Sequence, residues 1–360
     1  MTNAALRGKP DAGNPHVRFD EGEVASCTAE ASLRRVPSRR KPEGRASGCA
    51  ATPRRGALLY KTVNACCSKI ACACLLLAGA QTAYAAGKPS GADVVRPSHK
   101  SLIAHRGESV DAPENTLPAY KLAVERGFGF ECDLYLSKDG RVFTFHDRDL
   151  KRTTAGANTN KCADVTWDEL SKLDVGGWGK WKGSKFEGTR PALLEEVLAL
   201  ARDGRQIYLE IKSGPNIVPV IKKILAAQKN ATPRNVLFIS FNKQVCAAVK
   251  EHLPDYKVYW LLGSKVGQGD ARRPITAQEA VEGARAARAD GIDIVFDQKV
   301  VDEAFVAGVK KAGLSFHVWT IDDLSKALRA FALGADTVTT NRAKDLYEEY
   351  QRTASGNDGE

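Results

Sequence analysis

The chain has 360 residues, of which 43% are hydrophobic and 27% are charged, and its formal net charge is +10. Residues 1–86 hold 13 of the 53 Lys and Arg residues but only 6 of the 43 Asp and Glu residues, a net of +7, which leaves the rest of the chain at +3. This near-balance of charge argues against nucleic-acid binding by residues 87–360. The three cysteines of that part are too few for a domain stabilised mainly by disulfides.

Residues 1–60 are rich in Arg, Pro, Gly, Ser and Ala and lack a sustained apolar period. This composition predicts a disordered basic leader, because it cannot bury enough apolar surface to offset the entropy of ordering. A basic run between Arg34 and Lys41 leaves open a contact with nucleic acid or a membrane surface, although a solvated tail is the simpler interpretation.

A second signal follows at residues 61–85. Lys61 and Lys69 precede an apolar stretch at 70–80, and a small-x-small pattern follows at Ala83–Ala85. A basic start, a short apolar core and a small cleavage site are typical of a secretory signal peptide, whereas about 11 apolar residues are too few for a membrane span. We therefore expect translation to start near Leu58–Val63, a linker at 86–99, and export to the bacterial periplasm without stable membrane insertion of the mature protein.

From residue 100 onward, short β-rich runs alternate with helical patterns. Parallel strands are expected at Ser101–Ala104, Gly129–Leu134, Gln206–Ile211, Val236–Ser240, Val258–Leu262, Ile292–Phe296, Phe316–Trp319 and Thr337–Thr339. Helices are expected at Leu117–Arg126, Ile217–Lys229, Lys243–Glu251, Ala277–Ala289, Val301–Ala312 and Leu324–Leu333.

Eight strands separated by helices over about 245 residues predict an α/β fold, a (β/α)8 barrel of the TIM type over residues 100–348, with a disordered tail at 349–360. An open, doubly wound sheet is the alternative, but such sheets usually carry a glycine-rich phosphate motif after the first strand, and the sequence has none there.

One further strand, Val142–His146, follows the second strand through Ser137–Gly140. The link is too short for a parallel crossover, and Asp139-Gly140 is a hairpin turn signal. We therefore expect an antiparallel return strand that brings His146 close to Asp133 at one end of the barrel.

Active-site groups of such a barrel lie at the carboxyl ends of its strands. Ionisable residues fall there in four segments, His105-Arg106, Glu131–Asp133, His146-Asp147 and Glu210–Lys212. Because side chains alternate along a strand, Glu131 and Asp133 share one face, as do Glu210 and Lys212.

Three converging carboxylates (Glu131, Asp133, Glu210) without a soft ligand predict one hard divalent cation, Ca²⁺ or Mg²⁺. Histidines beside it would serve as general acid and base, and basic side chains would contact a phosphate group. Taken singly, His105-Arg106-Gly107 would usually be a turn and Glu131-x-Asp133 a solvated face, and His146 could be a structural histidine. Their convergence at successive strand ends carries the prediction.

The motifs together resemble the glycerophosphodiester phosphodiesterase family, in order and in spacing, over about residues 100–348. The matching segments are Leu102–Gly107, Ala112–Leu117, Phe130–Asp133, Lys138–Gly140, Phe145–Asp147, Leu150–Thr154, Leu193–Leu198, Leu209–Lys212, Ile239–Phe241 and Val318–Ile321. One departure is Ala343, where the family often has a proline.

The resemblance implies metal-dependent hydrolysis of glycerophosphodiesters to an alcohol and sn-glycerol 3-phosphate on a TIM barrel. It implies a set of roles as well: His105 and His146 as the catalytic pair, Glu131, Asp133 and Glu210 as metal ligands, and Arg106, Lys212, Glu114, Asn115, Phe241 and Trp319 around the substrate.

Two other functions stay open on sequence alone. A phospholipase D-like enzyme acting on lysophospholipids would share the histidines and carboxylates, and a protein that binds glycerophosphodiesters without turnover would share the pocket. The sequence does not specify the head group, the choice between Ca²⁺ and Mg²⁺ or the role of each histidine. It also leaves open the attacking nucleophile and the oligomeric state.

Overall fold

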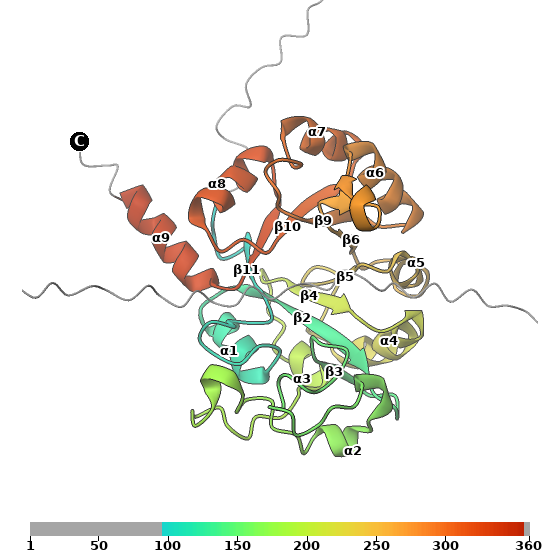
Figure 1. Ribbon diagram of the computed structural model, residues 1–360, viewed down its shortest axis with the longest axis vertical. Coiled ribbons are helices and arrows are strands. Elements are labelled where there is room, and N and C mark those ends of the chain that lie inside the picture. Colours follow the sequence, from blue (N-terminus) through green and yellow to red (C-terminus); the bar gives the residue numbers. More distant parts are fainter. Residues whose placement is uncertain (1–95, 356–360) are drawn as a thin grey trace, which may run out of the picture. The chain divides into compact units, whose positions relative to one another are not determined.

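The computed structural model describes residues 96–355, and eight of their strands form a closed parallel barrel (Figure 1). In spatial order these are β1 (Leu102–Ala104), β2 (Gly129–Leu136), β4 (Ile207–Ile211), β5 (Val236–Ser240), β6 (Val258–Leu262), β9 (Gly291–Val295), β10 (Ser315–Trp319) and β11 (Thr337–Thr340). The first and last strands close the barrel, because β1 pairs in parallel with both β2 and β11. The predicted TIM-type fold is confirmed, and all eight expected strands are present with shifts of one or two residues at their ends.

Helices surround the barrel. They are α1 (Leu117–Glu125), α3 (Leu194–Leu198), α4 (Val218–Ala227), α5 (Lys243–His252), α6 (Ala277–Ala286), α7 (Glu303–Lys311), α8 (Leu324–Leu333) and α9 (Ala343–Ser355). Short 3-10 turns lie at η1 (Cys162–Asp164), η2 (Gly179–Trp181), η3 (Pro215–Ile217) and η4 (Gly269–Ala271). A two-stranded ribbon of β7 (Lys265–Val266) and β8 (Arg273–Pro274), absent from the sequence-based prediction, follows β6.

A long excursion, residues 137–193, separates β2 from α3 and lies on one side of the barrel (Figure 1). It starts with β3 (Val142–Thr144), which pairs antiparallel with β2 as predicted, and also carries the short helix α2 (Trp167–Leu170). The excursion has its own small core, which includes Phe143, Leu150 and Leu170. It is therefore a packed layer against the barrel rather than a loose loop.

The strands divide their side chains between two cores. Outward-facing residues such as Cys132, Leu209 and Ile211 pack against the helices. Inward-facing residues fill the barrel with apolar rings and branched chains, and Tyr208 and His317 each bond the Thr337 hydroxyl at distances of 3.0 and 2.7 Å. This packing fills much of the interior, and two ionisable residues, Asp293 and His317, are also buried there.

Two predicted boundaries are wrong. Residues 349–355 continue helix α9 instead of starting a disordered tail, because Leu346 and Tyr347 anchor the helix against the core. The end of the expected linker is also packed, since the His99 ring lies 4.9 Å from the Phe128 ring and 4.4 Å from the Tyr347 ring.

The predicted leader and signal peptide lie outside the described residues. Within the described part, no helix has both the length and the apolarity that a membrane span requires.

Gly129 provides a test of how tightly the barrel is closed. A Cβ at this position would lie 2.4 Å from the backbone oxygen of Gln206 on the neighbouring strand segment, so Gly129→Ala should lower the free energy of unfolding by about 1–3 kcal/mol. Urea unfolding measures the change. Gly214→Ala is the control, since its new Cβ meets only the Asn216 side chain, which can turn away. Equal stabilities of the two variants would contradict the close strand packing at Gly129.

Candidate active site

Three buried carboxylates form the centre of the site. One oxygen each of Glu131, Asp133 and Glu210 lies within 4.8 Å of the others, at the carboxyl ends of the adjacent strands β2 and β4. Burial and the charges of its neighbours, first Asp133 and then Glu210, raise the pKa of Glu131 well above its usual range. Oε1 of Glu131 has no hydrogen-bond partner among the described residues. The predicted convergence of the three acids is therefore present, and the cluster lacks a counter-charge on one side.

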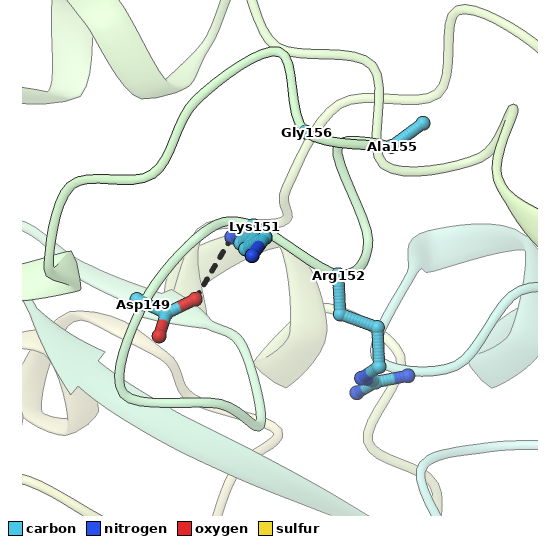
Figure 2. A pocket seen from close by; sticks show the side chains of 5 residues that line it. All are labelled: Asp149, Lys151, Arg152, Ala155 and Gly156. Carbon is cyan, nitrogen blue, oxygen red and sulfur yellow. Dashed lines mark hydrogen bonds between the residues drawn. The ribbon is translucent and has the colours of Figure 1, made fainter.

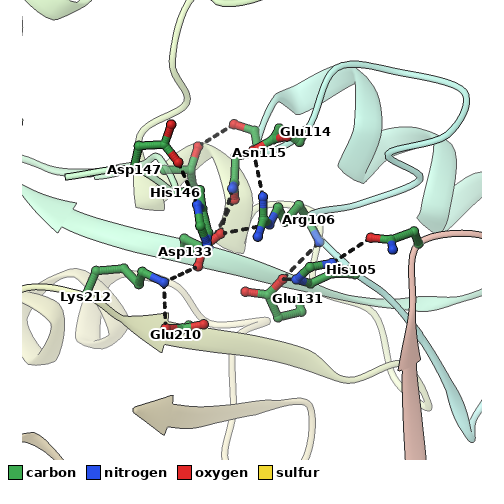
Figure 3. A network of polar contacts seen from close by, with 12 residues as sticks. His105, Arg106, Glu114, Asn115, Glu131, Asp133, His146, Asp147, Glu210 and Lys212 are labelled. Atoms are coloured by element: carbon green, nitrogen blue, oxygen red, sulfur yellow. Dashed lines mark hydrogen bonds and ion pairs between the residues drawn. The ribbon is translucent and has the colours of Figure 1, made fainter. Parts of the chain in front are cut away.

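Two cationic side chains lie close to the Asp133 carboxylate of this cluster. Lys212 Nζ lies 2.9 Å from Glu210 Oε1 and 3.4 Å from Asp133 Oδ1, and Arg106 Nε lies 3.6 Å from Asp133 Oδ2 (Figure 3). Burial disfavours the ionised form of Asp133, yet Lys212 and the other nearby cations hold the pKa of this carboxyl below its usual range. Asp133 is therefore a carboxylate at neutral pH even without a bound ligand.

Asn115 links the barrel to the first helix. Its amide nitrogen donates to Asp133 Oδ2 at 2.7 Å, and its oxygen accepts from the Asp133 backbone N–H at 3.0 Å and from the Tyr120 hydroxyl at 2.8 Å. The backbone of Asn115 is left-handed, with φ of 56°, a conformation that Asn tolerates better than most residues. Asn115 thus fixes the position of Asp133 instead of projecting into the cleft.

A tight turn after β1 places Arg106. Its backbone N–H donates to Glu131 Oε2 at 2.9 Å, and Gly107 follows with φ of 81°. A Cβ on Gly107 would lie 2.6 Å from the carbonyl carbon of Ala119, so both the backbone conformation and the close approach of α1 require glycine here.

His105 is held by a residue from the opposite end of the chain. Its Nδ1 lies 2.7 Å from Oδ1 of Asn341, which follows β11. The Asn341 amide nitrogen donates to Asp322 Oδ2 at 2.7 Å, so its oxygen must face the histidine, and Nδ1 of His105 carries the proton. Burial and the neighbouring charge of Arg106 lower the pKa of His105 to about 4, so the ring is neutral near pH 7 and Nε2 is an acceptor.

The loop that carries Asn341 is fixed by Asp322. Besides the Asn341 amide, Asp322 Oδ1 accepts from the Thr340 hydroxyl at 2.9 Å and from the Asn341 backbone N–H at 2.8 Å. These bonds order the loop directly before α9, although Ala343 stands where the resemblance leads one to expect proline.

His146 lies on the other side of the carboxylates, after β3. Its Nδ1 bonds Asp147 Oδ1 at 2.8 Å. Arg152 in turn donates from Nε to Asp147 Oδ2 at 2.7 Å and from both terminal nitrogens to Glu114, at 3.0 and 2.7 Å. Burial opposes ionisation of Glu114, but Arg106 and Arg152 lower its pKa to about 2. Glu114 therefore binds two arginines as a carboxylate.

A hollow of about 420 Å³ lies beside the loop that follows His146 (Figure 2). It is lined by Asp149, Lys151, Arg152, Ala155 and Gly156 and contains none of the three carboxylates or two histidines. Arg152 is the residue that it shares with the polar network, so the hollow borders the candidate site without being its centre.

The two aromatic residues predicted to line the cleft meet at the carboxyl ends of β5 and β10. The rings of Phe241 and Trp319 are perpendicular, with centroids 5.6 Å apart. Phe241 is 49% exposed, which plain barrel packing does not explain. The pair therefore lies at the carboxyl end of the barrel, with the Phe241 ring half-exposed.

Asp293 is a further acid inside the barrel that sequence reasoning missed. It is buried on β9, and its Oδ1 lacks a hydrogen-bond partner within residues 96–355. Burial, with the charge of Glu210 in addition, raises its pKa well above the usual range. Burial therefore disfavours the ionised form of Asp293.

The structure brings all eleven predicted site residues to one end of the barrel. Seven of them lie next to one another in one polar network (Figure 3), namely His105, Arg106, Glu131, Asp133, His146, Glu210 and Lys212. Sequence reasoning listed Asp147 only as an ionisable neighbour of His146. It missed Arg152, Asp322 and Asn341, which orient the predicted residues, and the buried acid Asp293. Arg152 could have been found, because it lies in the matched segment Leu150–Thr154.

The chain is similar to known proteins over most of the barrel. The sequence profile of the "Glycerophosphoryl diester phosphodiesterase family" matches residues 105–345. The chain is 33% identical over 249 residues to the "Glycerophosphodiester phosphodiesterase" of Caldanaerobacter subterraneus, with 68% of this chain and 95% of that one covered. It is 28% identical over 277 residues to the protein of the same name from Bacillus subtilis, with 73% and 90% covered.

Two solved structures are also similar to this chain in fold. A phosphodiesterase from Oleispira antarctica, solved in complex with the product sn-glycerol-3-phosphate, is 27% identical, with a TM-score of 0.59 and coverage of 70% of this chain and 96% of that one. A glycerophosphodiester phosphodiesterase from Thermotoga maritima is 25% identical, with a TM-score of 0.54 and coverage of 71% and 100%.

The buried acid Asp293 predicts a pH-dependent stability. Because its pKa is raised on folding, the folded chain keeps a proton that the unfolded chain releases above about pH 4, so this group's contribution to stability falls as pH rises toward its folded pKa. Asp293→Asn should flatten that fall, by at most about 1.4 kcal/mol per pH unit. Urea unfolding of both proteins in chelator between about pH 5 and 8 measures the difference. Parallel curves would show that Asp293 does not hold its proton.

Proposed function

Because the chain belongs to the glycerophosphoryl diester phosphodiesterase family, we propose that it hydrolyses glycerophosphodiesters to an alcohol and sn-glycerol 3-phosphate. The observation that carries the proposal is the convergence of three carboxylates, two imidazoles and two cations at the open end of the barrel. A relative of the same fold holds sn-glycerol-3-phosphate as its product, which is the phosphate monoester that this reaction would release.

The cluster of Glu131, Asp133 and Glu210 fits a hard divalent cation, Ca²⁺ or Mg²⁺. All three donors are oxygens, they lie within 4.8 Å of one another, and one buried oxygen of Glu131 lacks a partner among the described residues. The raised pKa of Glu131 indicates that the chain alone does not balance the acids. A divalent cation held there would supply positive charge beside a substrate phosphate and stabilise the charge that builds on it.

Arg106 and Lys212 are proposed to bind the phosphate. Each already touches Asp133 and has a second carboxylate partner, so both are fixed before substrate arrives. Fixed cations stabilise the added negative charge of the transition state without reorganising. Phe241 and Trp319 are proposed to contact the head group at the rim.

The two histidines are proposed to divide the proton transfers. His105 is neutral, and because its Nδ1–H is committed to Asn341, its Nε2 is free to accept a proton from the attacking oxygen. His146 uses Nδ1 to bond Asp147, so its Nε2 is the nitrogen that can deliver a proton to the leaving alcohol. The attacking oxygen is either the neighbouring glycerol hydroxyl, which gives a cyclic phosphate, or water.

The proposed substrate class predicts a specific assay result. Glycerophosphocholine, glycerophosphoethanolamine and glycerophosphoglycerol should release sn-glycerol 3-phosphate only with Ca²⁺ or Mg²⁺ present, and chelator should abolish the release, because the carboxylates need the cation. Coupled detection of sn-glycerol 3-phosphate measures this. Lysophosphatidylcholine turned over in preference to glycerophosphocholine would favour the lipase alternative, and tight substrate binding without product would favour a binding protein.

The histidine roles predict matched losses. His105→Ala and His146→Ala should each lower the rate by about 10²–10⁴-fold, because each removes one proton transfer. His252→Ala is the control, since His252 lies in the last turn of α5, away from the cleft. Steady-state kinetics on glycerophosphocholine compares the three variants. Near wild-type turnover in either cleft variant would refute its assignment.

A further inference from the structure

We infer that Arg152 is a positioning residue for the proposed reaction, because it holds the partners of His146 and Arg106 in one ion-pair network. The inference rests on the proposed function and adds to it a residue whose side chain contacts neither the carboxylate cluster nor the histidines. Arg152 comes from the excursion after β3, outside the barrel strands.

The network has two arms that meet at Arg152. On one arm, its Nε and one terminal nitrogen bind both oxygens of Asp147 at 2.7 and 3.1 Å, and Asp147 bonds His146. On the other arm, its terminal nitrogens bind both oxygens of Glu114 at 3.0 and 2.7 Å, and Glu114 accepts from Arg106 at 2.9 Å. One guanidinium therefore fixes two carboxylates, each in a two-point contact, and through them a proton-transfer residue and a phosphate-binding residue.

The geometry differs from that of an ordinary surface ion pair. Glu114 is only 15% exposed and Asp147 only 26% exposed, so both carboxylates are largely removed from water. The guanidinium also lies over the ring of Trp178, 4.9 Å from its centroid, which shields one of its faces. Pairs of this kind are screened less by solvent and lose little freedom on forming, because the planar fork of Arg matches each carboxylate.

Two further hydrogen bonds hold the backbone of the loop around Asp147. The Cys162 thiol donates to the Asp147 carbonyl at 3.3 Å, and the Cys162 backbone N–H donates to the Arg148 carbonyl at 3.0 Å. These bonds position the backbone but do not touch the carboxylate. The orientation of the Asp147 side chain, and with it the His146 ring, therefore depends on Arg152.

The chain offers a matched control in Arg190, another residue of the excursion. Arg190 also makes a two-point contact with one carboxylate, Glu196, is 41% exposed against 37% for Arg152, and lies over a tryptophan ring, that of Trp167, at 5.7 Å. It contacts none of the cleft residues. Arg190→Ala should therefore cost stability without affecting the proposed chemistry.

The test compares Arg152→Ala, Arg152→Lys and Arg190→Ala by steady-state kinetics on glycerophosphocholine with metal. Arg152→Ala should lower kcat/KM by about 10- to 100-fold, with most of the loss in kcat, as expected when a group that orients a reacting side chain is lost. Arg152→Lys, which keeps the charge but not the fork, should recover part of it, and added guanidinium should partly rescue Arg152→Ala. Arg190→Ala should keep the wild-type kcat, although its melting temperature should fall about as far as that of Arg152→Ala.

A second readout does not depend on turnover. In protein labelled with 15N at its six histidines, His146 is assigned by its absence in His146→Ala. Arg152→Ala should change the His146 imidazole signals, because the Asp147 partner is released, while Arg190→Ala should leave them as in wild type. If wild type hydrolyses no glycerophosphodiester, the proposed function fails but the imidazole spectra still test the network.

Two results would overturn the inference: a folded Arg152→Ala variant with wild-type kcat and unchanged His146 signals, or an equal loss of kcat in Arg190→Ala. A double variant gives a further check. If Arg152 acts through Asp147, Arg152→Ala should cost much less in an Asp147→Asn background than in wild type. Additive losses would show that Arg152 does not act through Asp147 and would contradict the arm of the network that reaches His146.

Discussion

Repulsion between three buried carboxylates is the constraint around which the candidate site is organised. Within 4.8 Å, Glu131, Asp133 and Glu210 disfavour one another's charge, and only opposite charge or protonation relieves this. Lys212 and Arg106 lie close to Asp133, whereas Oε1 of Glu131 has no hydrogen-bond partner among the described residues. Protonation of Glu131 or a cation bound among the three acids would relieve this repulsion.

Much of this arrangement could be predicted from the sequence because it follows from period-two alternation on barrel strands. Glu131 and Asp133 share one face of their strand wherever that strand is placed, and the same holds for Glu210 and Lys212. Because the two strands are parallel neighbours, the two pairs lie at the same height in the barrel. The short Asp139-Gly140 link similarly fixed the direction of β3 and the side on which His146 lies. These are local rules, and they need no knowledge of distant contacts.

The orienting residues follow no such rule. His105 and Asn341 are 236 positions apart, and nothing in the order of residues near either one indicates the bond. Arg152 and Trp178 belong to an excursion without regular periodicity, so their meeting depends on how that layer folds. The extent of α9 was missed for a related reason, because burial of Leu346 and Tyr347 against the barrel stabilises a helix whose sequence is largely polar. Tertiary packing decided each of these cases.

The closure of the barrel between its first and last strands has a consequence for when the protein can begin to work. His105 ends β1, and its partner Asn341 directly follows β11, so the seam where the sheet joins itself runs through the site. A ribosome must release nearly the entire chain before this imidazole acquires its orienting amide. A growing or truncated chain without β11 therefore lacks the hydrogen bond that orients the His105 ring.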